Sequence, residues 1–598
     1  MFLKVGRNTF RAGNRRCFKS FGLRFNSTVS GKNPNSSSKA FGYAGVGVLS
    51  AIGGLYLGKN WLQSEPKKTD HQTEEEDPST LPLNKLSSPV YADEEAFNKA
   101  LSAIKAVVGD DKVSNDKLVV EAHSDSFFST HHPPNPQKER PQVVVCPQNT
   151  EQVSQIMKIA HEYRVPIVAN SGMTSLEGHN MHTRGPYSVS LSFEDMDQVL
   201  AAHPDDLDIV VQPGLGWQEL DEYLLDNDET SHLMFGPDPG IGACIGGMVS
   251  TSCSGTNAYR YGTMKENVVN LTVVLADGTV VKTKQRPRKS SAGYDTTRLF
   301  IGAEGTLGII TEITLKLSVR PIKQVVSIVT FPTIKDAAAT ARYIISKSGM
   351  HLDAIELLNP TVMSFVNETA KETDSRTFRE KPTLLLKVGG STDAAIDEQI
   401  GLITKIAKDN ELIEIETSKS EDDNLVLWTA RRNGLWSTIE YGRKILEDKN
   451  DVQIWTTDIA VPISKLDTVI SETNDDLNAS GFENKFSVLG HVGDGNCHFL
   501  ILYNSKDYGQ VQDVVDRMVH RALHYEGTCT GEHGVGVGKR KYLNEELGTS
   551  TVNLMREIKL LLDPRRILNP DKIFKIDPKD NLDQLLSSGH IREHGKPC

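Results

Sequence analysis

The sequence predicts an α+β protein with two large domains, preceded by an N-terminal region with the features of a targeting segment and a membrane anchor. The length of 598 residues, with 38% hydrophobic and 24% charged residues, is enough for two or three globular domains. From residue 140 onward, short β-rich runs alternate with amphipathic segments of helical period. Glycine is concentrated, because 17 of the 47 glycines lie between Gly172 and Gly308. Glycine at this density indicates that the backbone closely approaches a ligand or other backbone at several places.

The composition excludes several classes of function. The net charge is −12 at pH 7, and basic runs are few outside the N-terminal region, so we expect no nucleic-acid partner. The seven cysteines include no Cys-x-x-Cys pair, which argues against a cysteine zinc site, a c-type haem and an iron–sulfur cluster. A large acidic enzyme or a scaffold protein remains.

The N-terminal region has the composition of a targeting segment followed by a membrane span. Residues 1–64 contain no aspartate or glutamate but many basic and phenylalanine residues, which predicts a mitochondrial transit peptide over 1–26. Residues 41–58 carry no charge and would extend about 27 Å as a helix, so we expect a single transmembrane anchor. The alternatives are a disordered basic tail and a glycine-rich linker. A polar linker follows over 63–90.

Basic residues precede the expected anchor, which predicts its orientation. In an inner mitochondrial membrane the basic side would face the matrix. The rest of the chain would then lie in the intermembrane space.

The first domain opens with a strand–helix–strand pattern. We expect strands over 143–146 and 165–170 and an amphipathic helix over 151–163, with Thr150 as its N-cap. The segment NSGMTSLEG (170–178) follows directly. A glycine-rich loop with exposed backbone N–H groups and hydroxyl side chains suits a pyrophosphate, and a plain turn is the alternative.

Four more glycine-rich segments follow at intervals. They are VQPGLGW (211–217), FGPDPGIGACIGG (235–247), SGTNAYRYG (254–262) and GAEGTLGIITE (302–312). A hairpin is expected within 271–281, at Asp277–Gly278. No Gly-x-Gly-x-x-Gly segment opens a helix after a strand, and Gly538–Lys539 lacks the upstream glycine and the Ser or Thr of a P-loop. A Rossmann dehydrogenase and a P-loop ATPase are therefore both disfavoured.

These five ordered segments resemble the FAD domain of the p-cresol methylhydroxylase/vanillyl-alcohol oxidase flavoproteins, and within them the FAD-linked 2-hydroxy-acid dehydrogenases. The resemblance covers roughly residues 140–575. It implies a two-part FAD-binding domain and an α/β cap domain with an antiparallel sheet that binds substrate. The implied diphosphate contacts are Asn170, Ser171, Gly172, Thr174, Ser175 and Gly178. The implied contacts to the remainder of FAD are Pro237, Asp238, Ile245, Gly246, Gly247, Gly255, Gly262, Glu304 and Ile310.

Two details of the resemblance affect the cofactor. Met173 stands where many members have glycine, so the diphosphate loop is expected to be slightly reshaped. No histidine matches a covalent flavin attachment site, so we expect non-covalent FAD.

The resemblance and the composition together suggest the domain limits. We expect an N-terminal helical extension over 91–139, the FAD-binding domain over 140–318 and the cap domain with the metal site over 319–545. The segment 546–575 resembles the family's closing segment, which returns to the FAD domain, and 576–598 forms a polar tail.

The cap domain contains a candidate metal site. His491 and His498 are seven residues apart across a Gly/Asp turn, which predicts strand–turn–strand with both rings toward one site. Glu532 and His533 lie in a second glycine-rich loop. Two imidazoles and a carboxylate are a common ligand set for a divalent transition metal, and hydrogen-bonded loop histidines without a metal are the alternative.

The resemblance assigns roles to these side chains. It implies that His491, His498 and Glu532 bind a zinc- or manganese-type ion and that His533 is the catalytic base. A metal ion on the substrate hydroxyl would lower its pKa, and a histidine with an ordinary pKa of about 6.5 can take the proton at neutral pH. In the segment WTAR (428–431), Arg431 matches the subgroup's arginine and is expected to bind the substrate carboxylate.

The implied reaction is the oxidation of a small D-2-hydroxy acid, lactate to pyruvate, with the stereochemistry taken from the family. Leu435 and Thr456 stand near the positions where relatives that act on dicarboxylates have polar or cationic side chains. The chain has no second redox motif, so an external acceptor is needed. Removal of 1–26 would change the net charge from −12 to −19 by loss of seven basic residues, which favours the basic protein cytochrome c.

Three alternatives remain open. They are the oxidation of D-2-hydroxyglutarate or another D-2-hydroxy acid with another acceptor, an ether-lipid synthase that uses flavin without net oxidation, and a non-catalytic membrane scaffold with a degenerate FAD fold.

Overall fold

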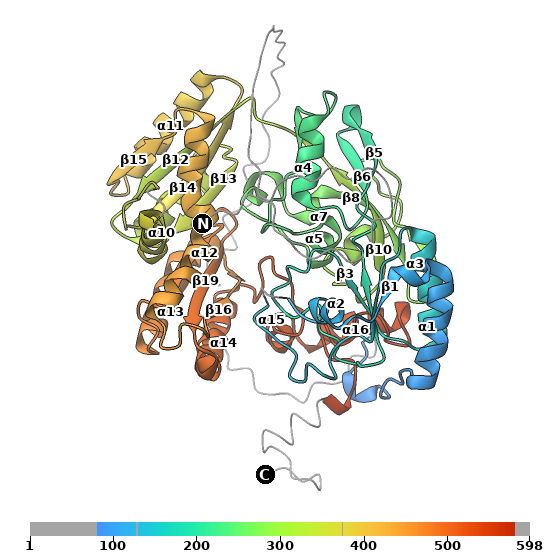
Figure 1. Ribbon diagram of the computed structural model, residues 1–598. Coiled ribbons are helices and arrows are strands. Elements are labelled where there is room, and N and C mark those ends of the chain that lie inside the picture. The colour runs from blue at the N-terminus through green and yellow to red at the C-terminus, as the bar shows by residue number, and fades with distance from the viewer. Residues whose placement is uncertain (1–79, 127–128, 373–374, 581–598) are drawn as a thin grey trace, which may run out of the picture. The chain divides into compact units, whose positions relative to one another are not determined.

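The computed structural model describes residues 80–126, 129–372 and 375–580 (Figure 1). The expected transit peptide (1–26), the expected anchor (41–58) and most of the expected linker (63–90) lie outside the described residues, as does most of the tail. Among the residues that are described, no helix is both long and apolar enough to cross a bilayer.

A small mixed sheet opens the first half of the described chain. Its strand order is β1-β2-β4-β3, with β2, β4 and β3 parallel to one another and β1 antiparallel. The strands are β1 (Val113–Ser114), β2 (Val143–Val145), β3 (Ile167–Asn170) and β4 (Val189–Ser192). Helices α1 (Glu94–Val108) and α3 (Thr150–Tyr163) bury their apolar faces in the same core cluster as the strands, and α2 (Lys117–Ala122) lies near β2.

A five-stranded antiparallel sheet completes the first half, in the order β5-β6-β10-β8-β9. The strands are β5 (Val199–His203), β6 (Asp208–Val211), β8 (Val268–Val274), β9 (Val280–Lys282) and β10 (Ile309–Lys316), with a separate pair β7 (Leu233–Met234) and β11 (Ser318–Val319). The helices of this part are α4 (Trp217–Asp226), α5 (Ile245–Thr251), α6 (Ala258–Tyr261), α7 (Met264–Asn267) and α8 (Thr296–Phe300). Strand β8 is buried along its whole length, and its sequence is apolar except for the buried Asn270 and Thr272.

The expected strand–helix–strand opening and the hairpin are present, with one correction. Strands β8 and β9 pair across the expected turn at Asp277–Gly278. Helix α3 is capped by Asn149, whose side chain accepts from the amide of Gln152. Thr150 was the wrong residue for the cap, because it is already the first helical residue and its hydroxyl bonds the Thr311 hydroxyl instead.

The second half is built on an eight-stranded antiparallel sheet. Its order is β15-β12-β14-β13-β18-β19-β16, and β17 also pairs with β19. The strands are β12 (Lys323–Thr330), β13 (Ala354–Leu358), β14 (Thr383–Gly390), β15 (Glu414–Thr417), β16 (Gln453–Thr456), β17 (Ile459–Ala460), β18 (Phe486–Gly490) and β19 (Asn496–Tyr503).

Helices cover both faces of this sheet, because alternate strand residues point to opposite faces. One core cluster joins the sheet to α9 (Ile334–Lys347), α11 (Asp393–Lys408), α13 (Leu466–Ala479) and α14 (Tyr508–His524). The other joins it to α10 (Pro360–Glu372) and α12 (Glu421–Ile445). The α+β class with antiparallel sheets, expected from the sequence, is confirmed.

The C-terminal part of the described chain packs on the first half. Helices α15 (Leu543–Leu547) and α16 (Thr549–Leu562) lead to a short extended segment. Ile167 of β3 donates its amide to the Ile567 carbonyl and accepts the amide of Asn569, at 2.8 Å each. Ile567 is fully buried in the core of the first half. The segment around Leu568 therefore extends the first sheet after the chain has passed through the second half.

Candidate active site

The turn between β18 and β19 brings two histidines edge to face, with ring centroids 5.4 Å apart. The Nδ1 atom of His491 lies 2.7 Å from Glu356 Oε1, and that of His498 lies 2.9 Å from the Thr457 carbonyl oxygen. With Nδ1 occupied, each ring turns its Nε2 atom toward another partner.

Glu532 lies where the two Nε2 atoms meet. Its Oε1 is 3.1 Å from His491 Nε2 and 3.2 Å from His498 Nε2. Its Oε2 accepts a hydrogen bond of 2.6 Å from the hydroxyl of Ser254, a residue of the first half. One ligand atom from each of His491, His498 and Glu532 lies within 4.8 Å of the others. Two oriented imidazoles and a held carboxylate fit a divalent transition metal.

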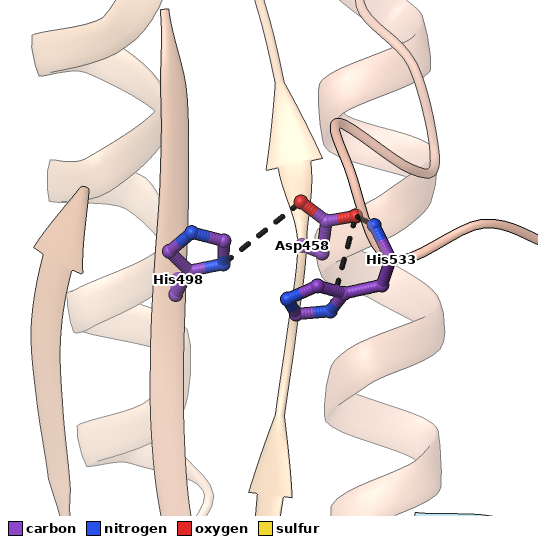
Figure 2. A group of neighbouring side chains, drawn as sticks. All are labelled: Asp458, His498 and His533. Atoms are coloured by element: carbon purple, nitrogen blue, oxygen red, sulfur yellow. Dashed lines mark hydrogen bonds and ion pairs between the residues drawn. The ribbon is translucent and has the colours of Figure 1, made fainter. Parts of the chain in front are cut away.

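His533 lies beside His498 and Asp458, which form a second group of possible metal ligands with it (Figure 2). Its ring stacks on His498, with centroids 5.1 Å apart and an interplanar angle of 15°. Its Nδ1 is buried without a hydrogen bond, 3.9 Å from Asp458 Oδ2 and 3.9 Å from Glu177 Oε1. Burial lowers the pKa of His533 to about 4, below the ordinary value assumed from the sequence. The ring is therefore neutral at pH 7.

Asp458, directly before β17, lies beside His498 and His533 (Figure 2) and holds the loop that carries Glu532 and His533. Its Oδ2 accepts the backbone amides of both residues at 2.9 Å. The same oxygen accepts the Thr530 hydroxyl at 2.9 Å and the Lys539 ammonium at 3.2 Å. The carboxyl is fully buried, and although burial raises its pKa, the neighbouring His533 and Lys539 side chains hold that pKa well below its usual range.

Arg431 lies on α12 and is joined to the histidine group by Glu356 of β13. Its Nε donates to Glu356 Oε2 at 2.6 Å, while the other carboxylate oxygen bonds His491. Glu356 is completely buried, and His491 and Arg431 keep its pKa below the usual value against the effect of burial. The structure thus brings the expected substrate clamp within two hydrogen bonds of an expected metal ligand.

The expected diphosphate loop (170–178) lies against the segment 242–247. A Cβ on Gly172 would come within 2.5 Å of the Gly242 carbonyl oxygen, and one on Gly247 within 3.3 Å of the Ser171 hydroxyl. Asn170 is buried, with its amide donating 2.7 Å to Ser190 and its Oδ1 left without a partner. Such a loop, with a free buried acceptor, fits a bound dinucleotide.

The backbone at Met173 explains the departure noted in the sequence. Its φ of 54° is left-handed, a conformation that glycine adopts without strain, which fits the glycine found there in many members. The Met173 carbonyl accepts a hydrogen bond from the Ser126 hydroxyl, and its sulfur lies 3.1 Å from Asn180.

Some of the other expected FAD residues shape the backbone of these loops, and others pack into the core. Backbone approach requires glycine at 255, where φ is 125° and a Cβ would lie 2.7 Å from Asp238. Asp238 in turn accepts the Thr256 hydroxyl and the Asn257 amide. The side chains of Ile245 and Ile310 pack into the core of the first half. A Cβ on Gly246 would meet Pro213, one on Gly262 would meet Glu266, and Thr174 lies against Gly242. Ser175 bonds His179, Gly178 has a positive φ, and Pro237 is buried.

Glu304, expected to contact FAD, uses its side chain to hold the loop 530–539, called the base loop here after the expected base His533. Its two oxygens accept the amides of Val535 at 2.6 Å and of Gly536 at 2.9 Å. Glu177 of the diphosphate loop also holds the base loop, through an ion pair in which Lys539 Nζ lies 3.1 Å from its Oε1. Although burial raises it, the pKa of Glu177 falls to about 2, chiefly because of Lys539. The loop 530–539 is thus attached to both halves.

Sequence reasoning missed several residues of the site. Glu356 and Asp458 belong to no motif, whereas Ser254 and Glu177 lie in the glycine-rich segments and Lys539 in the base loop without being singled out. The only signal for Glu356 and Asp458 was an acidic residue inside or beside an apolar strand, a position that is costly unless the charge is paired.

Comparison with known proteins identifies the class. Residues 141–284 match the model described as "FAD binding domain", and residues 320–573 match "FAD linked oxidases, C-terminal domain". The solved structure of p-cresol methylhydroxylase with substrate bound superposes with a TM-score of 0.66 at 16% identity, over 82% of this chain and 99% of that one. The fold and the two matches define an FAD-binding flavoenzyme of the FAD-linked oxidases, and the p-cresol methylhydroxylase type of fold is confirmed.

Two similar sequences narrow the class further. The D-lactate dehydrogenase (cytochrome) of Kluyveromyces lactis is 48% identical over 89% of this chain and 91% of its own. D-lactate dehydrogenase (cytochrome) 1 of Saccharomyces cerevisiae is 46% identical over 93% of this chain and 94% of its own. Both are named mitochondrial. The chain belongs to the D-lactate dehydrogenase (cytochrome) family of FAD-linked oxidases.

The variant Asp458→Asn tests the role of this carboxyl in holding the base loop. An amide has one accepting oxygen, so its NH₂ group would face the amides of Glu532 and His533 or the Asn496 side chain. We expect kcat to fall by about 10–100-fold, the usual cost of losing a group that orients a site, with FAD still bound. Steady-state kinetics and the flavin absorbance measure both quantities. Unchanged kcat in the folded, yellow variant would contradict this role.

Proposed function

We propose that the protein oxidises D-lactate to pyruvate, using non-covalent FAD and a divalent metal ion, zinc or manganese, and passes the electrons to cytochrome c. One observation carries the proposal: His491, His498 and Glu532 converge at one buried point beside the neutral His533, in a chain of the D-lactate dehydrogenase (cytochrome) family. When bound, FAD supplies the hydride acceptor and the divalent ion supplies the positive charge that makes a nearby hydroxyl more acidic.

The residues of the chain supply binding and proton transfer. Arg431, aligned by Glu356, binds the substrate carboxylate through the part of its guanidinium that the Nε bond leaves free. His533, unprotonated at neutral pH, accepts the proton of the substrate hydroxyl. The surroundings of the site exclude water, because His491, His498 and Glu356 are each at most 5% exposed.

The side chains at the two positions expected to face a second carboxylate favour a small monocarboxylate. Leu435 lies one helical turn after Arg431 on α12, and it packs against the apolar cluster under that helix. Thr456, at the end of β16, is uncharged. Neither side chain pairs with a second carboxylate, which makes D-2-hydroxyglutarate the weaker candidate.

Anaerobic flavin reduction separates the candidate substrates. Mixing the purified holoenzyme with D-lactate should bleach the yellow flavin, and cytochrome c should then be reduced when added. L-lactate and D-2-hydroxyglutarate serve as the matched alternatives and should bleach it at least about 10-fold more slowly, because a misplaced or unpaired group costs 1.4 kcal/mol or more. Faster bleaching by D-2-hydroxyglutarate would show that it, and not D-lactate, is the preferred substrate. If none of the three compounds bleached the flavin, the proposed dehydrogenase activity would be refuted.

Metal removal tests the divalent ion. Treatment of the enzyme with a chelator, followed by gel filtration, should leave FAD in place but abolish flavin reduction by D-lactate. Without the ion, no neighbouring cation lowers the pKa of the substrate hydroxyl. Zinc or manganese should restore the reduction. Magnesium serves as the control, because a site with two imidazoles favours transition metals. Full activity in protein shown to be metal-free would contradict the metal's role.

The N-terminal region is proposed to tether the enzyme to the inner mitochondrial membrane. The acid-free, arginine-rich residues 1–26 act as a transit peptide, and the uncharged residues 41–58 as a single anchor with the catalytic domains in the intermembrane space. In isolated mitochondria the protein should resist carbonate extraction and become sensitive to protease once the outer membrane is opened. Release by carbonate, or protection until the inner membrane is lysed, would contradict the anchor or its orientation.

A further inference from the structure

Glu356 is the only group that connects the two recognition elements of the site within the described residues. It lies on β13 with no exposed surface. One oxygen is 2.7 Å from His491 Nδ1 and the other is 2.6 Å from Arg431 Nε. The histidine belongs to the candidate metal site and the arginine to the candidate substrate clamp.

Each of these bonds fixes an orientation that the neighbouring group needs. The Nδ1 atom of His491 bonds Glu356, which turns its Nε2 atom toward Glu532, 3.1 Å away. The Arg431 Nε is likewise held, which fixes the plane of the guanidinium and leaves its outer edge for a carboxylate. A single carboxylate therefore sets both directions at once.

The geometry points to Glu356 as a positioning residue shared by metal binding and substrate binding, so that its loss weakens both together. This inference rests on the proposed function. The carboxylate touches neither the metal position nor the substrate position, and it acts only through His491 and Arg431. A residue with a merely structural role would change stability without changing these two affinities in parallel.

Asp208 provides a matched control elsewhere in the protein. Its carboxylate also bridges a histidine and an arginine, with Oδ1 2.8 Å from His203 Nδ1 and Oδ2 3.1 Å from Arg286 Nη2. It is 4% exposed and lies on β6 of the five-stranded sheet, where no residue of the candidate site is bonded to it. The variant Asp208→Asn removes the same kind of bridge without touching the site.

The test compares Glu356→Gln with Asp208→Asn in the full-length holoenzyme. A glutamine keeps one accepting oxygen, and its NH₂ group must then face either His491 or Arg431, both of which donate. We expect zinc affinity, measured by competition with a chromogenic chelator, to fall by about 10–100-fold. At saturating zinc we expect the KM for D-lactate to rise by about 10-fold or more. The variant Asp208→Asn should change neither quantity.

A double-mutant cycle checks that the substrate effect passes through Arg431. The variant Arg431→Ala should raise KM by itself, and adding Glu356→Gln to it should raise KM no further, because the positioned group is already gone. Additive effects on KM would overturn the inference. So would a loss of zinc affinity with unchanged KM, or a Glu356→Gln enzyme that behaves as Asp208→Asn does.

The variant Glu356→Asp provides a test if Glu356→Gln does not fold. Glu356→Asp keeps the charge but shortens the side chain by one methylene, so it can reach His491 or Arg431 but not both. It should lose zinc affinity or raise KM, and wild-type values for both would overturn the inference. The wild-type enzyme separates this inference from the proposed function, because wild-type protein that binds no zinc or manganese, or that D-lactate does not reduce, refutes the function itself.

Discussion

The site depends on the pairing of carboxylates that are buried where the two halves of the protein meet. Glu356, Asp458 and Glu532 have little or no contact with water, and an unpaired charge in such a place would cost several kcal/mol. Each is instead satisfied by donors that the site itself needs: an imidazole, a guanidinium or the amides of the base loop. The same bonds that offset desolvation therefore orient the groups that act on the substrate.

This constraint also ties the chemistry to the assembly of the whole chain. The loop 530–539 receives bonds from three residues of the first half: Ser254 to Glu532, Glu304 to the amides of Val535 and Gly536, and Glu177 to Lys539. In the proposed function, a flavin held by the first half and a substrate held by the second must come within reaction distance. Bonds that fix the base loop to both halves keep that distance constant.

Regular patterns in the sequence predicted the fold class and much of the site. The β-rich runs and the turn at Asp277–Gly278 appear as strands and a hairpin because their local preferences agree with their burial. The histidines at 491 and 498 could be paired from the sequence, since a strand–turn–strand of this length returns the chain to the same place. The N-cap was misplaced by one residue, because Asn149 and Thr150 both have capping side chains and only the backbone decides between them.

The sequence by itself determined the FAD-binding class, through the resemblance of its five glycine-rich segments to a known family, and it predicted that His491 and His498 lie together, because such segments are local properties of the chain. Only the tertiary structure decided which distant carboxylates complete the site. Glu356 and His491 are 135 residues apart, and Asp458 and His533 are 75 apart. No local pattern records such a separation, because these contacts arise when antiparallel strands from distant parts of the chain pair in register. The pairing of β13 with β18 is what brings Glu356 beside His491.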